Sequence, residues 1–254
     1  MIPTLSLTDS NDNIYTFPEA FWLSDESVSA SQNIVNRTYA SGGKNVADGY
    51  LQARPIVIDG ALRADTLSEL ETLRRAFIKA CLKGGKLEIS DDPVSRYIQV
   101  EAPQFVITKG DYRNEIAVTV TFIAEDPFWR STSLFTVEQT VTGDDTIDVD
   151  NSDSDFIVSM IIEVENDQSV DNPGIKFTNP DDGGMSLTYN DSKFLDGDLL
   201  IINNEEGTVK KNNNNMINNL VVPARFLRLQ PISNGLEYEG AAATIRVKFR
   251  KAYL

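Results

Sequence analysis

Few residues in this chain of 254 could carry catalytic chemistry, because it has no histidine and one cysteine. Histidine is the usual general base near neutral pH, so every Ser-His-Asp or Cys-His arrangement is excluded. Zinc and iron sites also depend on histidine or cysteine. Cys81 lies on a predicted helix face, where a small buried hydrophobic residue is expected. The sequence predicts no enzyme activity, no catalytic residue, no metal site and no cofactor.

Carboxylates are the remaining candidates, and they are densest from Asp144 to Asp155. Calcium needs only oxygen ligands, but an EF-hand loop begun at Asp148 has Asp153 where glycine is required. It also has Ser159 where the bidentate glutamate is required. We therefore expect an acidic, solvated linker, with a calcium site of another shape left open as the alternative.

The charge balance argues against nucleic-acid binding as a function. The formal net charge is −15: residues 1–130 hold 18 acidic and 13 basic residues, and the remainder holds 20 and 10. Proteins bind phosphate backbones through basic surfaces, which neither half offers. The chain has no run of about 18 apolar residues, so we expect no membrane insertion.

A strand and a sharp corner close the first half of the chain. Over residues 116–122, the large apolar side chains of Ile, Val and Phe alternate with Ala and Thr, which is typical of a half-buried strand. Proline has no backbone donor, so the strand cannot continue through residue 127. The predicted corner consists of Asp126, Pro127, Phe128 and Trp129. It marks the edge of an N-terminal domain over residues 1–132.

This N-terminal domain is expected to combine one helix with a set of strands. Apolar runs broken by turn residues predict strands over 4–23, 51–62, 87–90, 97–100, 104–109 and 114–125, the last two paired. Residues 24–50 are polar. They fit either a disordered surface loop or an arm that gains order by pairing with another subunit.

The helix is predicted over about residues 66–83. Thr66 and Glu69 form a capping box, and Gly84 and Gly85 end the helix. Apolar residues at steps of three and four form the predicted core stripe: Leu67, Leu70, Leu73, Phe77 and Cys81. The later turns are basic, which leaves that face either solvated or docked on an acidic partner.

Residues 133–254 predict a second domain that is all β. Short strands are expected over 133–141, 156–165, 174–178, 185–189, 198–204, 225–231 and 242–250. Turn residues separate them, including Asn234-Gly235, and the run Asn212–Asn215 is interpreted as a loop. The predicted fold is mostly β: an α+β N-terminal domain followed by a β-sandwich.

Three segments carry a resemblance to a known family. Arg54–Ile89 reads RPIVIDGALRADTLSELETLRRAFIKACLKGGKLEI, and Thr121–Ser131 reads TFIAEDPFWRS. The arginine-led strand, the capped helix with arginines, the glycine stop and the Asp-Pro-aromatic corner resemble the N-terminal domain of the distal tail proteins of long-tailed, non-contractile bacteriophages. Phe226–Leu254 is similar to the end of that family's second domain, a galectin-like sandwich.

The resemblance implies a structural protein of the phage tail tip or baseplate. Family members form a hexameric ring that joins the tail tube to the tail hub and receptor-binding apparatus, and DNA passes through its lumen. Six copies at −15 would carry −90, and such a wall would let a duplex slide. The implied partners are further copies of this chain, the tail tube protein, the tail hub or tail-associated protein, the tape-measure protein, and receptor-binding or side-fibre proteins. The implied location is the virion, after assembly in the host bacterial cytoplasm.

The same resemblance implies where copies would touch. Arm and ring contacts are expected from Arg37, Tyr39, Tyr50, Arg54, Arg74 and Arg75. A galectin-type site stacks sugar on a tryptophan, but Trp22 and Trp129 both precede the second domain, so sugar binding by that route is not expected. A carbohydrate-binding adaptor for host-surface adsorption is the alternative function, and a two-carboxylate glycoside hydrolase is a third.

Overall fold

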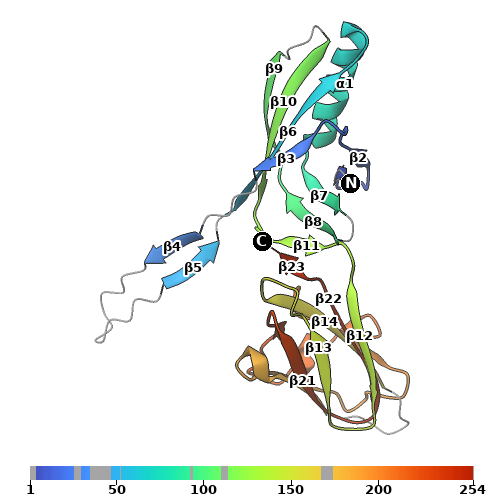
Figure 1. Ribbon diagram of the computed structural model, residues 1–254. Helices are drawn as coiled ribbons and strands as arrows, with labels where there is room; N and C mark the ends of the chain where they lie inside the picture. Colours follow the sequence, from blue (N-terminus) through green and yellow to red (C-terminus); the bar gives the residue numbers. More distant parts are fainter. Residues whose placement is uncertain are drawn as a thin grey trace. The chain divides into compact units, whose positions relative to one another are not determined.

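The computed structural model describes residues 4–25, 30–34, 47–51, 53–91, 94–109, 114–166 and 174–253 (Figure 1). The described chain is mostly strand, with one α-helix, as predicted. It divides into two units, residues 1–129 and residues 130–253. The predicted domain boundary, after residue 132, lies three residues further along. No helix of the described part is long and apolar enough to cross a membrane.

Unit 1 contains two antiparallel sheets. The first has the order β2-β1-β7-β8, built from β1 (Thr4–Thr8), β2 (Ile14–Thr16), β7 (Gly85–Asp91) and β8 (Val94–Val100). The second has the order β3-β6-β10-β9, built from β3 (Trp22–Asp25), β6 (Arg54–Arg63), β10 (Glu115–Ala124) and β9 (Gln104–Lys109). The predicted pairing of residues 104–109 with residues 114–125 is confirmed.

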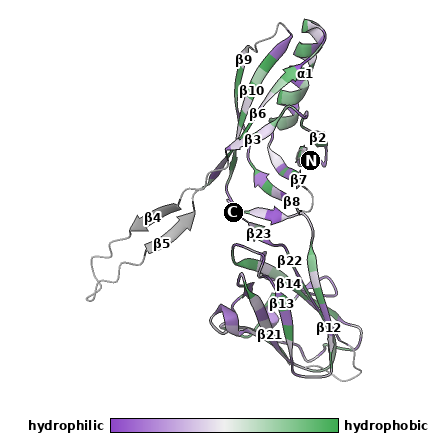
Figure 2. Ribbon diagram, viewed as in Figure 1, coloured by the Kyte–Doolittle hydropathy of each residue, from purple (hydrophilic) through white to green (hydrophobic). Residues whose placement is uncertain are grey.

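Period-two alternation places one face of the second sheet in the core. On β10, Val118, Val120 and Phe122 are at most 2% exposed, and on β6 the same holds for Ile56 and Ile58. Hydrophobic residues recur along β10 and on α1 (Figure 2). The residues between them on β10 face the other way and stay half-exposed, as the sequence predicts for this strand.

Helix α1 (Leu67–Cys81) covers this core. Its capping box is confirmed: the Glu69 amide donates to Thr66 Oγ1 (3.2 Å), and the Thr66 amide donates to Glu69 Oε2 (3.1 Å). The buried stripe is narrower than predicted. Leu70, Phe77 and Cys81 are buried, but Leu67 and Leu73 are 57% and 44% exposed. These two leucines lie at the margins of the stripe, beyond the reach of the sheet.

Phe77 is the centre of the core of unit 1. Its ring packs against four others, at centroid distances of 5.2–6.2 Å: Tyr15, Phe17, Phe21 and Phe105. Burial also raises the pKa of the Cys81 thiol to about 12. The cysteine is therefore a core residue, and its thiol stays protonated at neutral pH.

A hairpin occupies part of the predicted arm. β4 (Ala30–Ile34) and β5 (Ala47–Leu51) pair antiparallel, from Ala30 opposite Leu51 to Ile34 opposite Ala47. In the sheet order they pair only with each other. Tyr50 belongs to β5, whereas Arg37 and Tyr39 lie outside the described residues.

Unit 2 also contains two antiparallel sheets. One has the order β12-β22-β14-β17-β18-β19, with β20 beside β14. Its strands are β12 (Phe135–Val141), β22 (Ala243–Phe249), β14 (Val158–Asn166), β17 (Leu199–Asn203), β18 (Thr208–Lys211), β19 (Asn214–Asn215) and β20 (Arg228–Leu229). The other has the order β13-β21-β15-β16, built from β13 (Asp145–Asp150), β21 (Ser233–Glu239), β15 (Gly174–Asn179) and β16 (Met185–Asn190). Both sheets bury alternate residues, as a sandwich requires.

Short elements complete the description. In the sequence, β11 (Trp129–Ser131) begins at the last residue of unit 1 and continues into unit 2, and β23 (Ala252–Tyr253) ends unit 2. The Ser131 amide donates to the Lys251 carbonyl (2.9 Å). Two 3₁₀ turns, η1 (Pro180–Asp182) and η2 (Ile217–Asn219), are the described helical segments of unit 2.

Two predictions in unit 2 are wrong. The acidic stretch contains strand β13, in which Ile147 and Val149 are fully buried between exposed aspartates. Asn234-Gly235, predicted as a turn, lies inside β21. Asn234 is fully buried because its side chain is bonded at both ends: Oδ1 accepts from the Gln230 amide (2.9 Å), and Nδ2 donates to the Ile232 carbonyl (2.8 Å). The run at 212–215 is a tight turn into β19, with positive φ at Asn212 and Asn213.

Candidate assembly surface

The outward face of the β3-β6-β10-β9 sheet exposes large apolar side chains. Trp22 on β3 is 57% exposed, Val106 on β9 60% and Ile123 on β10 38%. The register places Trp22 opposite Asp59, and Asp59 and Val106 opposite Thr119. One row across all four strands therefore runs from an exposed tryptophan at one edge to an exposed valine at the other.

Most other residues on this face are small or uncharged. The outward positions of β6 and β10 are Pro55, Val57, Asp59, Ala61, Arg63, Glu115, Ala117, Thr119, Thr121 and Ile123. Asp59 accepts a hydrogen bond from Thr119 Oγ1 (2.5 Å), and Glu115 at the end of the face pairs with Arg63 (2.5 Å). A face of this composition offers packing area and little acid–base chemistry.

Both edges of this sheet are open. Among the described strands, β3 and β9 each have a hydrogen-bonded neighbour on one side only. The unpaired backbone groups of an edge strand can pair with a strand of another chain. The open edges and the apolar face together make this sheet the candidate assembly surface of unit 1.

The predicted Asp-Pro-aromatic corner is built inside unit 1. The Phe128 amide donates to Asp126 Oδ1 (3.3 Å), and Arg54 Nη1 donates to the Pro127 carbonyl (3.1 Å). Trp129 is fully buried, with the Arg96 guanidinium carbon 5.1 Å from its ring centroid. Arg54 was expected among the ring contacts, but it is 3% exposed and holds the corner instead, which leaves little of it for a neighbouring subunit.

Arg74 and Arg75 lie on the surface of α1 and share Glu71. Arg74 Nη2 and Arg75 Nε are 2.8 and 2.9 Å from Glu71 Oε1. Hydrogen bonds from Arg74 and then Arg75 lower the pKa of Glu71 to about 2. Both arginines stay accessible to a partner, so their predicted ring contact remains a proposal.

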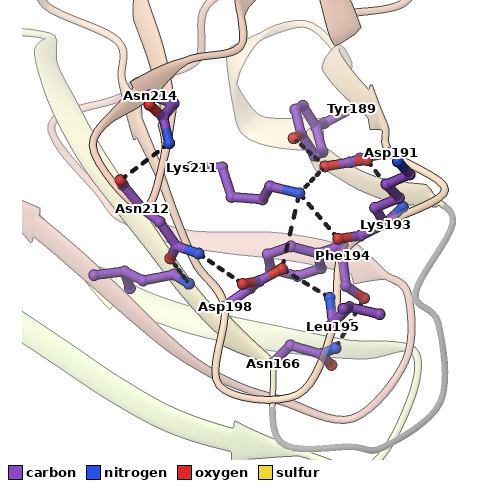
Figure 3. A network of polar contacts seen from close by, with 11 residues as sticks. Asn166, Tyr189, Asp191, Lys193, Phe194, Leu195, Asp198, Lys211, Asn212 and Asn214 are labelled. Atoms are coloured by element: carbon purple, nitrogen blue, oxygen red, sulfur yellow. Dashed lines mark hydrogen bonds and ion pairs between the residues drawn. The ribbon is translucent and has the colours of Figure 1, made fainter.

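A polar network in unit 2 was not predicted from the sequence (Figure 3). Lys211 Nζ donates to Asp191 Oδ2 (2.5 Å) and to the Lys193 carbonyl (2.9 Å), and it lies 3.8 Å from Asp198 Oδ2. Tyr189 Oη also donates to Asp191 Oδ2 (3.0 Å). Burial acts to raise the pKa of Asp191, but these bonds outweigh it and leave that pKa below its ordinary value.

The network joins segments that are distant in sequence. Asn212 Nδ2 donates to Asp198 Oδ1 (2.6 Å), and Asn212 Oδ1 accepts from the Leu199 amide (2.9 Å). Asn166 Nδ2 donates to the Phe194 carbonyl (3.2 Å). Each charged group of the network has a partner inside unit 2, so we assign the network to holding the loop before β17 rather than to binding. In the part of the chain that is described, no group of three Asp, Glu, Cys or His side chains could hold a metal ion.

Comparison with known proteins gives matches to phage tail components. Residues 153–253 match a family described as the siphovirus-type tail component, C-terminal domain. The Dit protein of phage SPP1, described as a paradigm of the hub adsorption apparatus in phages that infect Gram-positive bacteria, has the same fold. The TM-score is 0.74 at 15% identity, with 100% of both chains covered.

A second solved structure agrees with this fold. A chain of the phage P2 baseplate, in its activated conformation with calcium, matches with a TM-score of 0.51 at 11% identity. The match covers 99% of this chain and 98% of that one. A search of curated proteins found no match. The family match in unit 2 and the fold match over the whole chain confirm the resemblance to distal tail proteins.

Proposed function

We propose that this chain, which has the fold of the phage distal tail proteins, forms a hexameric ring at the tail tip. The ring joins the tail tube to the tail hub and the receptor-binding apparatus, and its lumen passes the DNA. The fold match supports a Dit-like structural role. The observation that carries the ring itself is the β3-β6-β10-β9 sheet, with its two open edges and exposed apolar face.

Two different edges of one sheet make a contact that repeats. If β3 of one copy pairs with β9 of the next, each copy added at an end still offers one unused edge until the ring closes. A head-to-tail contact of this kind closes into a ring when its rotation divides a full turn. Trp22 and Val106 lie at these two edges, so pairing would also remove their apolar area from water.

The arm supplies a second contact in this proposal. Among the described strands, β4 and β5 of the hairpin pair with each other and with no third strand, which leaves their outer backbone groups available. Strand addition onto a neighbouring copy would satisfy them. The expected side chains for this contact are Arg37, Tyr39 and Tyr50, with Arg74 and Arg75 on α1.

A net charge of −15 per chain suits a conduit for DNA. A polyanion that meets an acidic wall forms few lasting contacts and slides past. The tail tube protein, the tail hub and the tape-measure protein are the expected neighbours. The carbohydrate-binding alternative gains no support, because both tryptophans of the chain belong to unit 1.

A lysine on the open edge tests the sheet contact. We expect Val106→Lys to stop ring formation, because a charged side chain on an edge strand opposes strand pairing. The matched control is Ile14→Lys, which changes a 71% exposed apolar residue in the other sheet of unit 1. Sedimentation velocity should show hexamers for the wild type and Ile14→Lys and monomers for Val106→Lys. Hexamers of Val106→Lys would contradict the edge contact.

Deletion of residues 28–50 tests the arm separately. We expect a soluble monomer with the circular dichroism spectrum of a folded β protein, because β4 and β5 pair with each other and with no further strand that the structure describes. A deleted chain that still sediments as a hexamer would remove the arm from the account.

A further inference from the structure

We infer that unit 2 of one copy docks on unit 2 of the next copy, through opposite edges of the β13-β21-β15-β16 sheet. The inference rests on the proposed ring and adds a second interface to it. The two edges differ in charge, and each exposes apolar side chains. They belong to the same folded unit, so every copy in a ring presents both.

The β13 edge is acidic. Residues 144–155 contain six aspartates and no basic residue, and β13 is the terminal strand of its sheet. Asp148 lies on the exposed side of β13 and forms no ion pair with another described residue. Apolar area lies beside these charges, because Ile232 is 46% exposed and its carbonyl accepts from the Asn151 amide (3.1 Å).

The opposite edge is extended by a segment that follows η2. Leu220 forms a bridge with Tyr189 of β16, and the Val221 amide donates to the Thr188 carbonyl (2.9 Å). The chain then exposes apolar side chains to an unusual degree: Ile217 is 40% exposed, Val221 42% and Val222 87%. This edge therefore presents a hydrophobic strip that lies beyond β16.

The charge near this strip is opposite to that of the chain as a whole. Residues 207–236 contain four basic residues and no acidic one, in a chain of net charge −15. Lys211 and Arg228 are paired internally with Asp191 and Asp182. Lys210 and Arg225 are exposed and form no ion pair within the described residues. Their charges are left for an acidic partner.

The partner that fits is a second copy of this chain. Its β13 edge carries carboxylates and the exposed Ile232, which complement the cations and the apolar strip at residues 217–222. Each copy carries one acidic β13 edge and one strip at residues 217–222. A contact between the acidic edge of one copy and the strip of the next is head-to-tail, so it obeys the same ring symmetry as the unit 1 contact. Complementary charge would also fix the orientation of the docking.

Cysteine cross-linking in the full chain tests this interface. We would combine Val222→Cys with Asp148→Cys and treat the purified protein with a bifunctional maleimide. The native Cys81 is fully buried, so it should not react. We expect a ladder of covalent oligomers up to six chains on a denaturing gel. Each single variant should give no ladder, and neither should Val222→Cys combined with Thr140→Cys, which lies on the other sheet.

Charge reversal adds a second readout. In the double-cysteine chain, we would replace both cations with the substitutions Lys210→Glu and Arg225→Glu. Like-charge repulsion should then slow cross-linking about fivefold. Addition of Asp145→Lys and Asp150→Lys to this variant reverses the charge of the opposite edge as well and should restore the rate. A hexamer by sedimentation that gives no ladder would overturn this interface and leave the ring intact. A chain that forms no hexamer would overturn both proposals.

Discussion

At the scale of single residues, two neighbouring lysines have different surroundings. Lys211 is 15% exposed and bonds two buried or half-buried aspartates, whereas Lys210 is exposed and has no ion-pair partner among the described residues. Removal of a lysine that compensates buried carboxylates leaves those charges unpaired, which is far more costly than loss of a solvated charge.

We therefore expect Lys211→Met to lower the free energy of unfolding of unit 2 by about 3 kcal/mol. The neighbouring variant Lys210→Met is the matched control, and it should change that free energy by less than about 0.5 kcal/mol. Hydrogen exchange of the β14, β17 and β18 amides measures both effects in the intact chain. Equal protection in the two variants would contradict a structural role for the network.

The same network predicts a pH dependence. Folding lowers the pKa of Asp191 from its ordinary value of 3.8. The stabilisation that ionised Asp191 contributes to the folded state is therefore fully present above pH 3.8, and it is lost as the pH falls through the lower, folded-state pKa. The stability difference between wild type and Lys211→Met should shrink over that acidic range, because a protonated Asp191 no longer needs the ammonium. Hydrogen exchange of unit 2 at pH 6 and at pH 3 gives the comparison, and an unchanged difference would contradict this explanation.

At the scale of elements, Gly60 shows why β6 and the segment before β3 fit together. A Cβ atom at residue 60 would lie 2.3 Å from Cγ of Phe21, and Phe21 in turn stacks on Phe77 of α1 at 5.2 Å. A glycine inside a strand often marks a bend. Its role in the fold is instead to leave space for an aromatic ring in the core.

We expect Gly60→Ala to destabilise unit 1 by about 1–3 kcal/mol, because the ring of Phe21 must move out of a packed core. Gly143→Ala is the control, since a Cβ atom there meets nothing within 4 Å. Trp22 and Trp129 both belong to unit 1, so tryptophan fluorescence in urea reports on this unit. An equal midpoint for the two variants would show that the contact does not limit packing.

The elements also show what sequence patterns can and cannot reveal. The capped helix and the alternating β10 were predictable because each follows a local period, and local periods need no knowledge of the rest of the fold. β13 was missed because its two buried residues, Ile147 and Val149, stand among six aspartates that favour a linker. Asn234 was missed because only the folded chain supplies the partners that allow an amide to be buried.

The polar network shows the same limit for sites. Lys211 and Asp191 are 20 residues apart, and neither follows a motif that links them. Asp191 directly follows β16 in one sheet and Lys211 ends β18 in the other, so their meeting depends on how the two sheets of unit 2 pack. The Asp-Pro-aromatic corner is a local motif that can be found in the sequence, but the role of Arg54 could be assigned only after its partner, the Pro127 carbonyl, was located.

At the scale of the whole molecule, we propose that the two β units act by assembly. The open-edged sheet of unit 1 and the oppositely charged edges of unit 2 both favour head-to-tail contacts, which a closed ring satisfies without leaving an unused edge. The proposal of this function came from the resemblance to distal tail proteins, because composition and spacing alone indicated only an acidic β protein without a recognisable catalytic site.

The most direct test of the ring is the mass of the purified full-length chain, measured by native mass spectrometry. The account predicts one dominant species of about 169 kDa, six times the 28.2-kDa chain. A chain that stays at 28.2 kDa at every concentration measured would contradict it.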